Sequence, residues 1–206
     1  MDEVILARHG ESELSVVGAV NGDPAVTCVL TPTGEEQARQ LGEQLASVEL
    51  DLCVTSEFER ARQTADLALA DRHVPRLVLA ELNDVRFGRF EGGTLASYRE
   101  WAAANSPTVE APGGGESRTG TVARYVRAYR TILARPERTI LVVAHGLPIR
   151  YVLNALAQTD PAPLVEQVAY AEPYRLSADE LEAAVGLLEA WVERPNWNRN
   201  SRAARL

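Results

Sequence analysis

VILARHG, residues 4–10, is an apolar run that ends in Arg-His-Gly, and TILVVAHG, residues 139–146, ends in His-Gly as well. The 206 residues contain three histidines, and these two segments hold two of them. Short apolar runs of this kind are typical of buried β-strands. In an open parallel sheet, ligands bind beyond the carboxyl ends of the strands. The sequence therefore predicts that His9 and His145 lie together at that end of a sheet.

Short strand-like runs alternate with longer helical patterns along the chain. We expect strands over residues 4–7, 51–55, 76–80, 139–144 and 167–171. We expect helices over residues 33–46, 58–70, 94–104, 117–134, 147–157 and 177–192, the last starting with a capping box of Ser177 and Glu180. This alternation predicts a single α/β domain over residues 1–193, a three-layer α/β/α sandwich with a mainly parallel central sheet. Residues 194–206 contain four arginines and are expected to form an extended or flexible basic tail.

The composition limits the classes of function. Apolar residues make up 46% of the chain, enough for a substantial core, and the formal net charge is −8. A charge of this sign argues against nonspecific binding to nucleic acid or to an anionic membrane. The chain has no apolar run of about 18 residues, and its Met-Asp-Glu start lacks the basic residues of a signal peptide. We therefore expect a cytoplasmic protein without nucleic-acid or membrane partners, and a homodimer is one alternative for its oligomeric state.

The two strand-end histidines favour phosphate chemistry over metal binding. They lack Cys, Asp or Glu neighbours at ligand spacing, and the two cysteines match no metal or redox motif. Pro148 suits the first turn of a helix, so the positive end of that helix would lie near His145, where it favours an anion. An unprotonated imidazole is a nucleophile towards phosphorus and is accessible at neutral pH. These residues predict a metal-free site for a phosphate group.

Six short motifs follow one another in a fixed order. They are LARHGESE (6–13), LTPTGEEQA (30–38), TSEFERARQTA (55–65), FGRFEG (87–92), GGES (114–117) and VVAHG (142–146). Each is weak alone, but the set in this order resembles the histidine phosphatase superfamily, which includes the cofactor-dependent phosphoglycerate mutases. The resemblance covers roughly residues 4–157 and implies a phosphoglycerate mutase-like fold.

The resemblance also implies roles for individual residues of this sequence. His9 resembles the nucleophile that becomes phosphohistidine, and His145 resembles the second histidine of the pocket. Arg8 and Arg60 resemble the arginines that bind phosphate. Guanidinium groups suit this role because a transferring phosphoryl group spreads negative charge over its oxygens. Arg62 is the competitor of Arg60, but positions two apart on a helix point about 200° apart, and the motif favours Arg60.

Two positions depart from the family pattern. The family often has Asn at the position of Ser15, which leaves a phosphate contact there unassigned. Its acid is usually Glu in Leu-x-Glu-x-x-Phe-Gly, whereas this sequence has Asp84. Asp is one methylene shorter, so proton donation by Asp84 requires a movement of its loop or a relaying water. Glu81, three residues earlier, is the rival acid, and the register favours Asp84.

Three further residues are candidates for contacts with the substrate or within loops. Glu11 and Ser12 directly follow the nucleophile motif and either position the loop or touch the substrate. Arg86 would contact an acidic substrate or lie exposed on a loop.

Three functions remain open on these grounds. The favoured one is a metal-independent phosphomonoester hydrolase that acts on a small phosphorylated metabolite through phosphohistidine, without a cofactor. The alternative is a phosphoglycerate mutase, for which 2,3-bisphosphoglycerate would be the cofactor. The mutases usually carry a longer insertion between the positions of Glu91 and Gly114, so the short segment here favours the phosphatase. A third alternative is a non-catalytic phosphate-binding regulatory protein, against which the retention of all four pocket residues argues.

Overall fold

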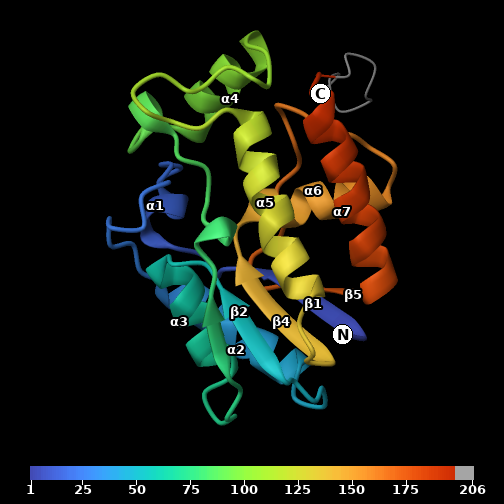
Figure 1. Ribbon diagram of the computed structural model, residues 1–206. Helices are drawn as coiled ribbons and strands as arrows, with labels where there is room; N and C mark the ends of the chain where they lie inside the picture. The colour runs from blue at the N-terminus through green and yellow to red at the C-terminus, as the bar shows by residue number, and fades with distance from the viewer. Residues whose placement is uncertain (198–206) are drawn as a thin grey trace.

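The computed structural model describes residues 1–197, and its five strands form one sheet in the order β3-β2-β4-β1-β5 (Figure 1). The strands are β1 (Glu3–Arg8), β2 (Leu52–Thr55), β3 (Arg76–Val78), β4 (Thr139–Ala144) and β5 (Pro173–Ser177). The first four run parallel, and β5 is antiparallel to β1. The predicted mainly parallel sheet is confirmed.

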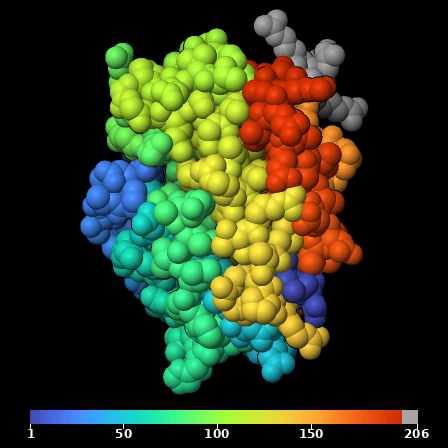
Figure 2. Space-filling view, in the orientation of Figure 1, coloured from blue at the N-terminus to red at the C-terminus, as the bar shows by residue number. Residues whose placement is uncertain are grey.

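Helices cover both faces of the sheet. They are α1 (Glu13–Val16), α2 (Pro32–Gln44), α3 (Glu59–Ala68), α4 (Leu95–Ala104), α5 (Arg118–Leu133), α6 (Gly146–Leu156) and α7 (Ala178–Glu193), with short 3₁₀ helices η1 (Ala80–Leu82) and η2 (Gly88–Phe90). On one face, α2 and α3 pack against the sheet, and on the other face α5, α6 and α7 do so. Figure 2 shows α5 and α7 side by side on this second face. The three-layer α/β/α sandwich is therefore confirmed.

The two core clusters follow from the alternation of side chains along the strands. In β1, Val4 and Leu6 face the α5–α7 layer, whereas Ile5 and Ala7 face the α2–α3 layer. In β4, Val142 faces the first of these layers in the same way. Both strands are buried on both faces, which explains why they are continuous apolar runs rather than alternating ones.

The register of β1 and β4 brings the two His-Gly units together. The strands pair in parallel from Glu3 with Thr139 to Arg8 with Ala144. The next backbone hydrogen bond runs from the amide of His9 to the carbonyl of Ala144, at 2.9 Å. His9 and His145 therefore leave neighbouring strands at the same level, as predicted.

The predicted strand over residues 167–171 is wrong. The segment makes one isolated bridge, between Tyr170 and Arg8, and Ala171 has a φ of 48°, which ends any extended run. The edge strand is instead β5, which leads directly into α7. Residues 167–170 instead contribute to the wall of a cavity beside β1.

The remaining elements agree with the sequence within a few residues. The strand expected over 76–80 ends at Val78 and continues as η1. The capping box is confirmed, because the Ser177 hydroxyl accepts from the amide of Glu180 and the Glu180 carboxylate accepts from the amide of Ser177. At the end of the described residues, Trp197 packs on Trp191. The rest of the predicted basic tail, residues 198–206, lies outside the described residues. No helix within residues 1–197 is long and apolar enough to cross a membrane.

Candidate active site

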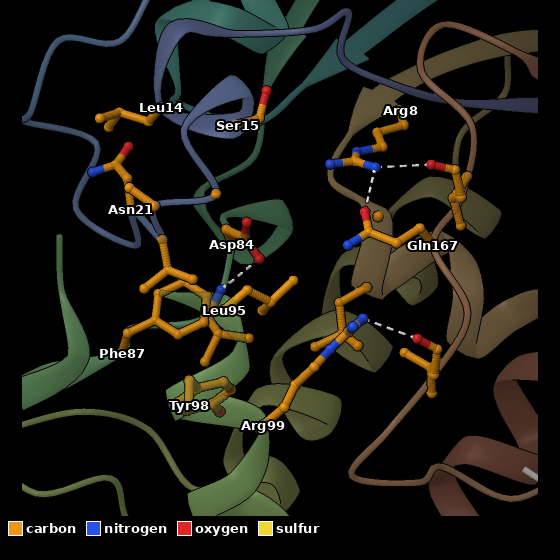
Figure 3. Close-up of a pocket in the computed structure, with 18 of the residues that line it drawn as sticks. Arg8, Leu14, Ser15, Asn21, Asp84, Phe87, Leu95, Tyr98, Arg99 and Gln167 are labelled. Carbon is orange, nitrogen blue, oxygen red and sulfur yellow. Dashed lines mark hydrogen bonds between the residues drawn. The ribbon is translucent and has the colours of Figure 1, made fainter. Parts of the chain in front are cut away.

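A cavity of about 190 Å³ opens at the carboxyl ends of β1 and β4. Its walls come from the loops after β1 and β3, the start of α6, helix α4, the first residue of α5 and segment 163–170. Figure 3 shows Arg8, Gln167 and Arg99 on one side of it and Leu14 and Phe87 on the other. The strand order of the fold thus produces the ligand site that the two His-Gly units predict.

The ring of His9 is fixed with one nitrogen free to react. Its Nδ1 lies 2.7 Å from the carbonyl oxygen of Gly10, and only a protonated ring nitrogen donates to a carbonyl. Nε2 therefore carries the lone pair, and it accepts from Nε of Arg60 at 3.2 Å. Burial holds the pKa of His9 well below 6.5, with repulsion from Arg60 and Arg8 acting in the same direction. The imidazole is neutral at neutral pH, as a nucleophile requires.

Arg60 is held rigidly beside this ring. Its Nη1 donates to Oδ1 of Asn21 at 2.8 Å, and its Nη2 donates to the Asn21 carbonyl at 3.2 Å. One turn later on α3, the Thr64 hydroxyl accepts from the amide of Gly10 at 2.9 Å and so joins the helix to the nucleophile loop. Arg60 is 4% exposed, which means that its charge acts in a largely dry site.

His145 lies next to His9, with ring centroids 5.3 Å apart. Its Nε2 lies 2.9 Å from the Ser56 hydroxyl, and its Nδ1 lies 3.4 Å from Nη2 of Arg60, behind the residues that line the cavity. The pKa of His145 is held well below 6.5 by burial and by the charge of Arg60. His145 is also the N-cap of α6 and makes no side-chain cap bond. The positive end of that helix adds to the attraction for an anion.

Asp84 brings a carboxyl group to the same point. Its Oδ2 lies 3.7 Å from Nη2 of Arg60 and 3.7 Å from Nδ1 of His145, and its side chain is 23% exposed. Burial raises the pKa of Asp84, although Arg60 and the amide of Val85 oppose that change. Arg124 holds the loop by donating to the carbonyl oxygen of Asp84, at 3.0 Å. The position of the carboxyl group and its raised pKa are those expected of a proton donor.

Arg8, the last residue of β1, lines the cavity as well. Its Nη1 donates to Oε1 of Gln167 and to the carbonyl of Val168, both at 2.9 Å, and its guanidinium stacks 4.0 Å from the ring centroid of Tyr170. Its Nε is buried and has no hydrogen-bond partner. Arg8 therefore keeps a free donor in a buried place, where a ligand that accepts it is favoured.

The other predicted residues divide into two groups. Ser12 and Ser15 line the cavity and hydrogen-bond to each other, with Oγ atoms 3.2 Å apart. Glu11 points away and accepts from the Thr31 hydroxyl at the start of α2. Arg62 pairs with Glu59 on the surface, whereas Arg60 lies beside His9.

Glu81 and Arg86 are not brought to the cavity. Neither belongs to its lining, and the exposed Arg86 side chain points towards Glu116, 3.8 Å away. The prediction that Arg86 could contact substrate is not supported by this placement, because its side chain points away from the cavity between the lining residues Val85 and Phe87. Asp84 is the carboxyl that faces the histidines, as the register favoured.

Comparison with known proteins gives consistent results. The model of the histidine phosphatase superfamily (branch 1) matches residues 4–189. The chain belongs to this superfamily. The predicted class, a histidine-type phosphatase, is confirmed at the level of the superfamily.

Individual relatives include both phosphatases and mutases. The uncharacterized phosphatase PhoE of Bacillus subtilis is 30% identical over 78% of this chain and 80% of its own length. A 2,3-bisphosphoglycerate-dependent phosphoglycerate mutase of Brucella melitensis is 30% identical over 91% of this chain and 98% of its own. Among solved structures, a putative alpha-ribazole-5'-P phosphatase of Escherichia coli superposes with a TM-score of 0.72 at 28% identity, over 85% of this chain and 90% of that one.

Within this member of the superfamily, three site residues were missed by the sequence interpretation. Ser56 follows the end of β2, so the strand-end rule that found the histidines could have found it as well. Thr64 lies one helical turn after Arg60, and this spacing places both on one face of α3. Asn21 lies in a loop without periodic pattern, and no signal in the sequence points to it. Within residues 1–197, no three His, Cys, Asp or Glu side chains gather as a metal site.

Proposed function

We propose that the protein hydrolyses phosphomonoesters of small metabolites by way of a phosphohistidine at His9, without a metal ion. The observation that carries this proposal is the state of the His9 ring. Its Nε2 carries a lone pair, and the pKa of the ring lies well below the usual value. The single N–H of the ring, at Nδ1, donates to the carbonyl oxygen of Gly10. A neutral imidazole beside two arginines and a carboxyl group is suited to attack on phosphorus.

In the first step, the phosphate of the substrate binds between Arg60, Arg8 and the start of α6. The hydrogen bond from Nε of Arg60 to His9 is exchanged for one to a phosphate oxygen. Nε2 then forms a bond to phosphorus while the bond to the ester oxygen breaks. Asp84 gives its proton to that oxygen, so the leaving group departs as an alcohol and Asp84 becomes a carboxylate.

In the second step, water attacks the phosphohistidine. The carboxylate of Asp84 accepts a proton from this water, the bond between phosphorus and Nε2 breaks, and inorganic phosphate leaves. His9 returns to its neutral form and Asp84 to its acid form, which closes the cycle. His145 lies beside both residues and stabilises the charge on the phosphoryl group in each step.

A mutase is the second candidate, because the Brucella melitensis mutase matches 91% of this chain. A mutase must protect phosphohistidine from water until it returns the group to a bound sugar acid. Between Glu91 and Gly114 this chain has only the ten-residue helix α4 and a Pro- and Gly-containing loop. These few residues would cover the phosphohistidine only in part, which favours water as the acceptor of the phosphoryl group.

The two candidates are separated by one assay on the purified protein. Release of inorganic phosphate from 3-phosphoglycerate is measured alongside its conversion to 2-phosphoglycerate, with and without 2,3-bisphosphoglycerate. Hydrolysis predicts phosphate release that does not depend on the bisphosphate. Interconversion that is much faster than phosphate release would identify a mutase. Deletion of residues 198–206 tests whether the basic tail changes this preference.

A further inference from the structure

Two arginines line the cavity beyond the residues that the proposed reaction uses. Arg99 extends from α4 towards segment 163–168, where its Nη2 donates to the carbonyl of Val165 at 2.9 Å (Figure 3). Arg118 is the first residue of α5 and also belongs to the cavity lining. Neither is part of a motif that supported the family resemblance. They add positive charge to the part of the cavity that a leaving group would occupy.

Arg118 is a buried cation with an unused donor. Its residue is 6% exposed, its Nη1 donates to the hydroxyl of Tyr151 at 3.1 Å, and its Nε has no hydrogen-bond partner. A buried charge is costly unless it is paired, and a buried donor without a partner adds to that cost. Nothing in the proposed hydrolysis requires this charge.

Burial acts to lower the pKa of Arg118, but the surrounding tyrosines outweigh it and raise that pKa, so Arg118 is charged in the free protein. Among residues 1–197, no carboxylate forms an ion pair with Arg99 or Arg118 within 4.0 Å. Arg118 also stands in the first turn of the 16-residue helix α5, where the helix dipole repels a cation. Burial lowers the pKa of Arg99, and repulsion from Arg118 and Arg8 acts in the same direction. An anion placed between the two guanidinium groups would supply the negative charge that no carboxylate provides there.

The opposite wall of the cavity is apolar in part, beside the polar Ser15 and Asn21. Leu14 and Phe87 belong to it, and Figure 3 shows them across the cavity from Arg8 and Gln167. Leu95, one turn before Arg99 on α4, adds a further apolar group to the lining. A leaving group inside the cavity therefore meets a hydrocarbon surface on one side and guanidinium groups on the other. This pairing suits a short carbon skeleton with a charged end.

We propose that Arg99 and Arg118 form a second anion subsite, so that the preferred substrate is a phosphomonoester whose leaving group carries a carboxylate or a second phosphate. The inference rests on the proposed hydrolysis at His9 and specifies its substrate class. The transferred phosphate lies at His9 and Arg60, and the second anion lies beside the guanidinium groups of Arg99 and Arg118 in the cavity lining.

The test compares three matched substrates. Propyl phosphate is assayed beside the two analogues that carry a terminal carboxylate or a terminal phosphate on the same chain, and kcat/KM is measured for each. The wild-type protein is expected to prefer at least one charged analogue over propyl phosphate by about tenfold or more, the size expected for a hydrogen bond to a charged group. The two analogues distinguish a carboxylate subsite from a phosphate subsite.

Variants assign this preference to the two arginines. Arg118→Gln and Arg99→Gln should each lower kcat/KM for the favoured analogue by about tenfold while changing the value for propyl phosphate by less than about threefold. Arg118→Lys retains the charge and should recover part of the preference. The matched control is Arg127→Gln, on the exposed face of the same helix α5, which should leave all three values unchanged. Thermal melting of each variant verifies its fold, and the less buried Arg99 provides the test if Arg118→Gln unfolds.

Failure of this inference is distinguishable from failure of the proposed function. Equal kcat/KM for all three substrates, or an equal loss for all three in both variants, would overturn the second subsite and leave hydrolysis intact. If no substrate releases phosphate, the proposed hydrolysis fails. Calorimetric titration of the wild-type and Arg99→Gln proteins with the charged analogues and with propyl phosphate then decides whether the subsite binds anions.

Discussion

Replacement of Asp84 by Asn separates proton donation from the other features of the site. The side chain keeps its size and the amide oxygen can still accept from Val85, but the transferable proton is lost. A positioned general acid contributes about 10²- to 10⁴-fold to a rate. We expect a loss of this size in kcat for propyl phosphate, whose alkoxide leaves only when protonated. For nitrophenyl phosphate, whose leaving group needs little protonation, the loss should be below about tenfold.

The geometry also predicts that KM does not rise in Asp84→Asn. When ionised, Asp84 stands 3.7 Å from the guanidinium of Arg60 and competes with phosphate for it. At an effective dielectric constant of about 20, such a pair attracts with about 4 kcal/mol, and partial exposure reduces this value. Removal of the carboxylate should therefore leave KM unchanged or lower it for both substrates.

The assay is steady-state kinetics with both esters on the wild type, Asp84→Asn and Glu81→Gln. Glu81 is the matched control, because it is the neighbouring carboxylate and lies outside the cavity. Equal slowing of both esters in Asp84→Asn would refute proton donation by this residue. A selective loss for propyl phosphate in Glu81→Gln would identify the other carboxylate as the acid.

The burial of His9 and His145 makes folding stability depend on pH as well. Their pKa values in the folded protein lie well below 6.5, whereas histidines of the unfolded chain take up protons near pH 6.5. The free energy of unfolding should therefore fall as the pH drops below 6.5. Urea denaturation at several pH values measures this fall, which should be weaker in His9→Asn. Activity should survive exhaustive chelation, and vanadate should inhibit as a phosphoryl mimic; full loss on chelation with recovery on adding Mg²⁺ or Zn²⁺ would contradict the metal-free reaction. Gly10→Ala places a Cβ 2.4 Å from the carbonyl oxygen of Gly34 and should cost about 1–3 kcal/mol or more of stability in thermal and urea melts, whereas Gly186→Ala, in open space on α7, should stabilise slightly.

The sequence sufficed for the features that depend on local pattern and strand order. Continuous apolar runs identify β1 and β4, and the rule for the carboxyl ends of parallel strands predicts that His9 and His145 lie together, as the register of these strands shows. The position of Asp84 beside His145 also followed from its register in the motif. These features depend on neighbours in the chain or on the regular geometry of a sheet.

What the sequence did not reveal depends on contacts between irregular segments. Asn21 reaches Arg60 from a loop. Residues 167–171 are predicted to form a strand, whereas in the structure Gln167 and Val168 accept hydrogen bonds from Arg8 at the cavity wall. The positive φ of Ala171 leaves no trace in the sequence, since Ala is compatible with a strand. The place of Arg118 in the cavity lining could not be predicted either, because a single arginine at the start of a helix does not indicate that this end of the helix is buried.

The most direct test of the proposed reaction is the position of the phosphoryl group during turnover. The protein is mixed with a radiolabelled phosphomonoester, quenched in alkali within one turnover and digested, and the labelled peptide is sequenced. The account predicts an acid-labile, alkali-stable label on His9 that forms and disappears fast enough to support kcat and is absent from His9→Ala. A label on another residue, or one that persists in His9→Ala, would contradict it.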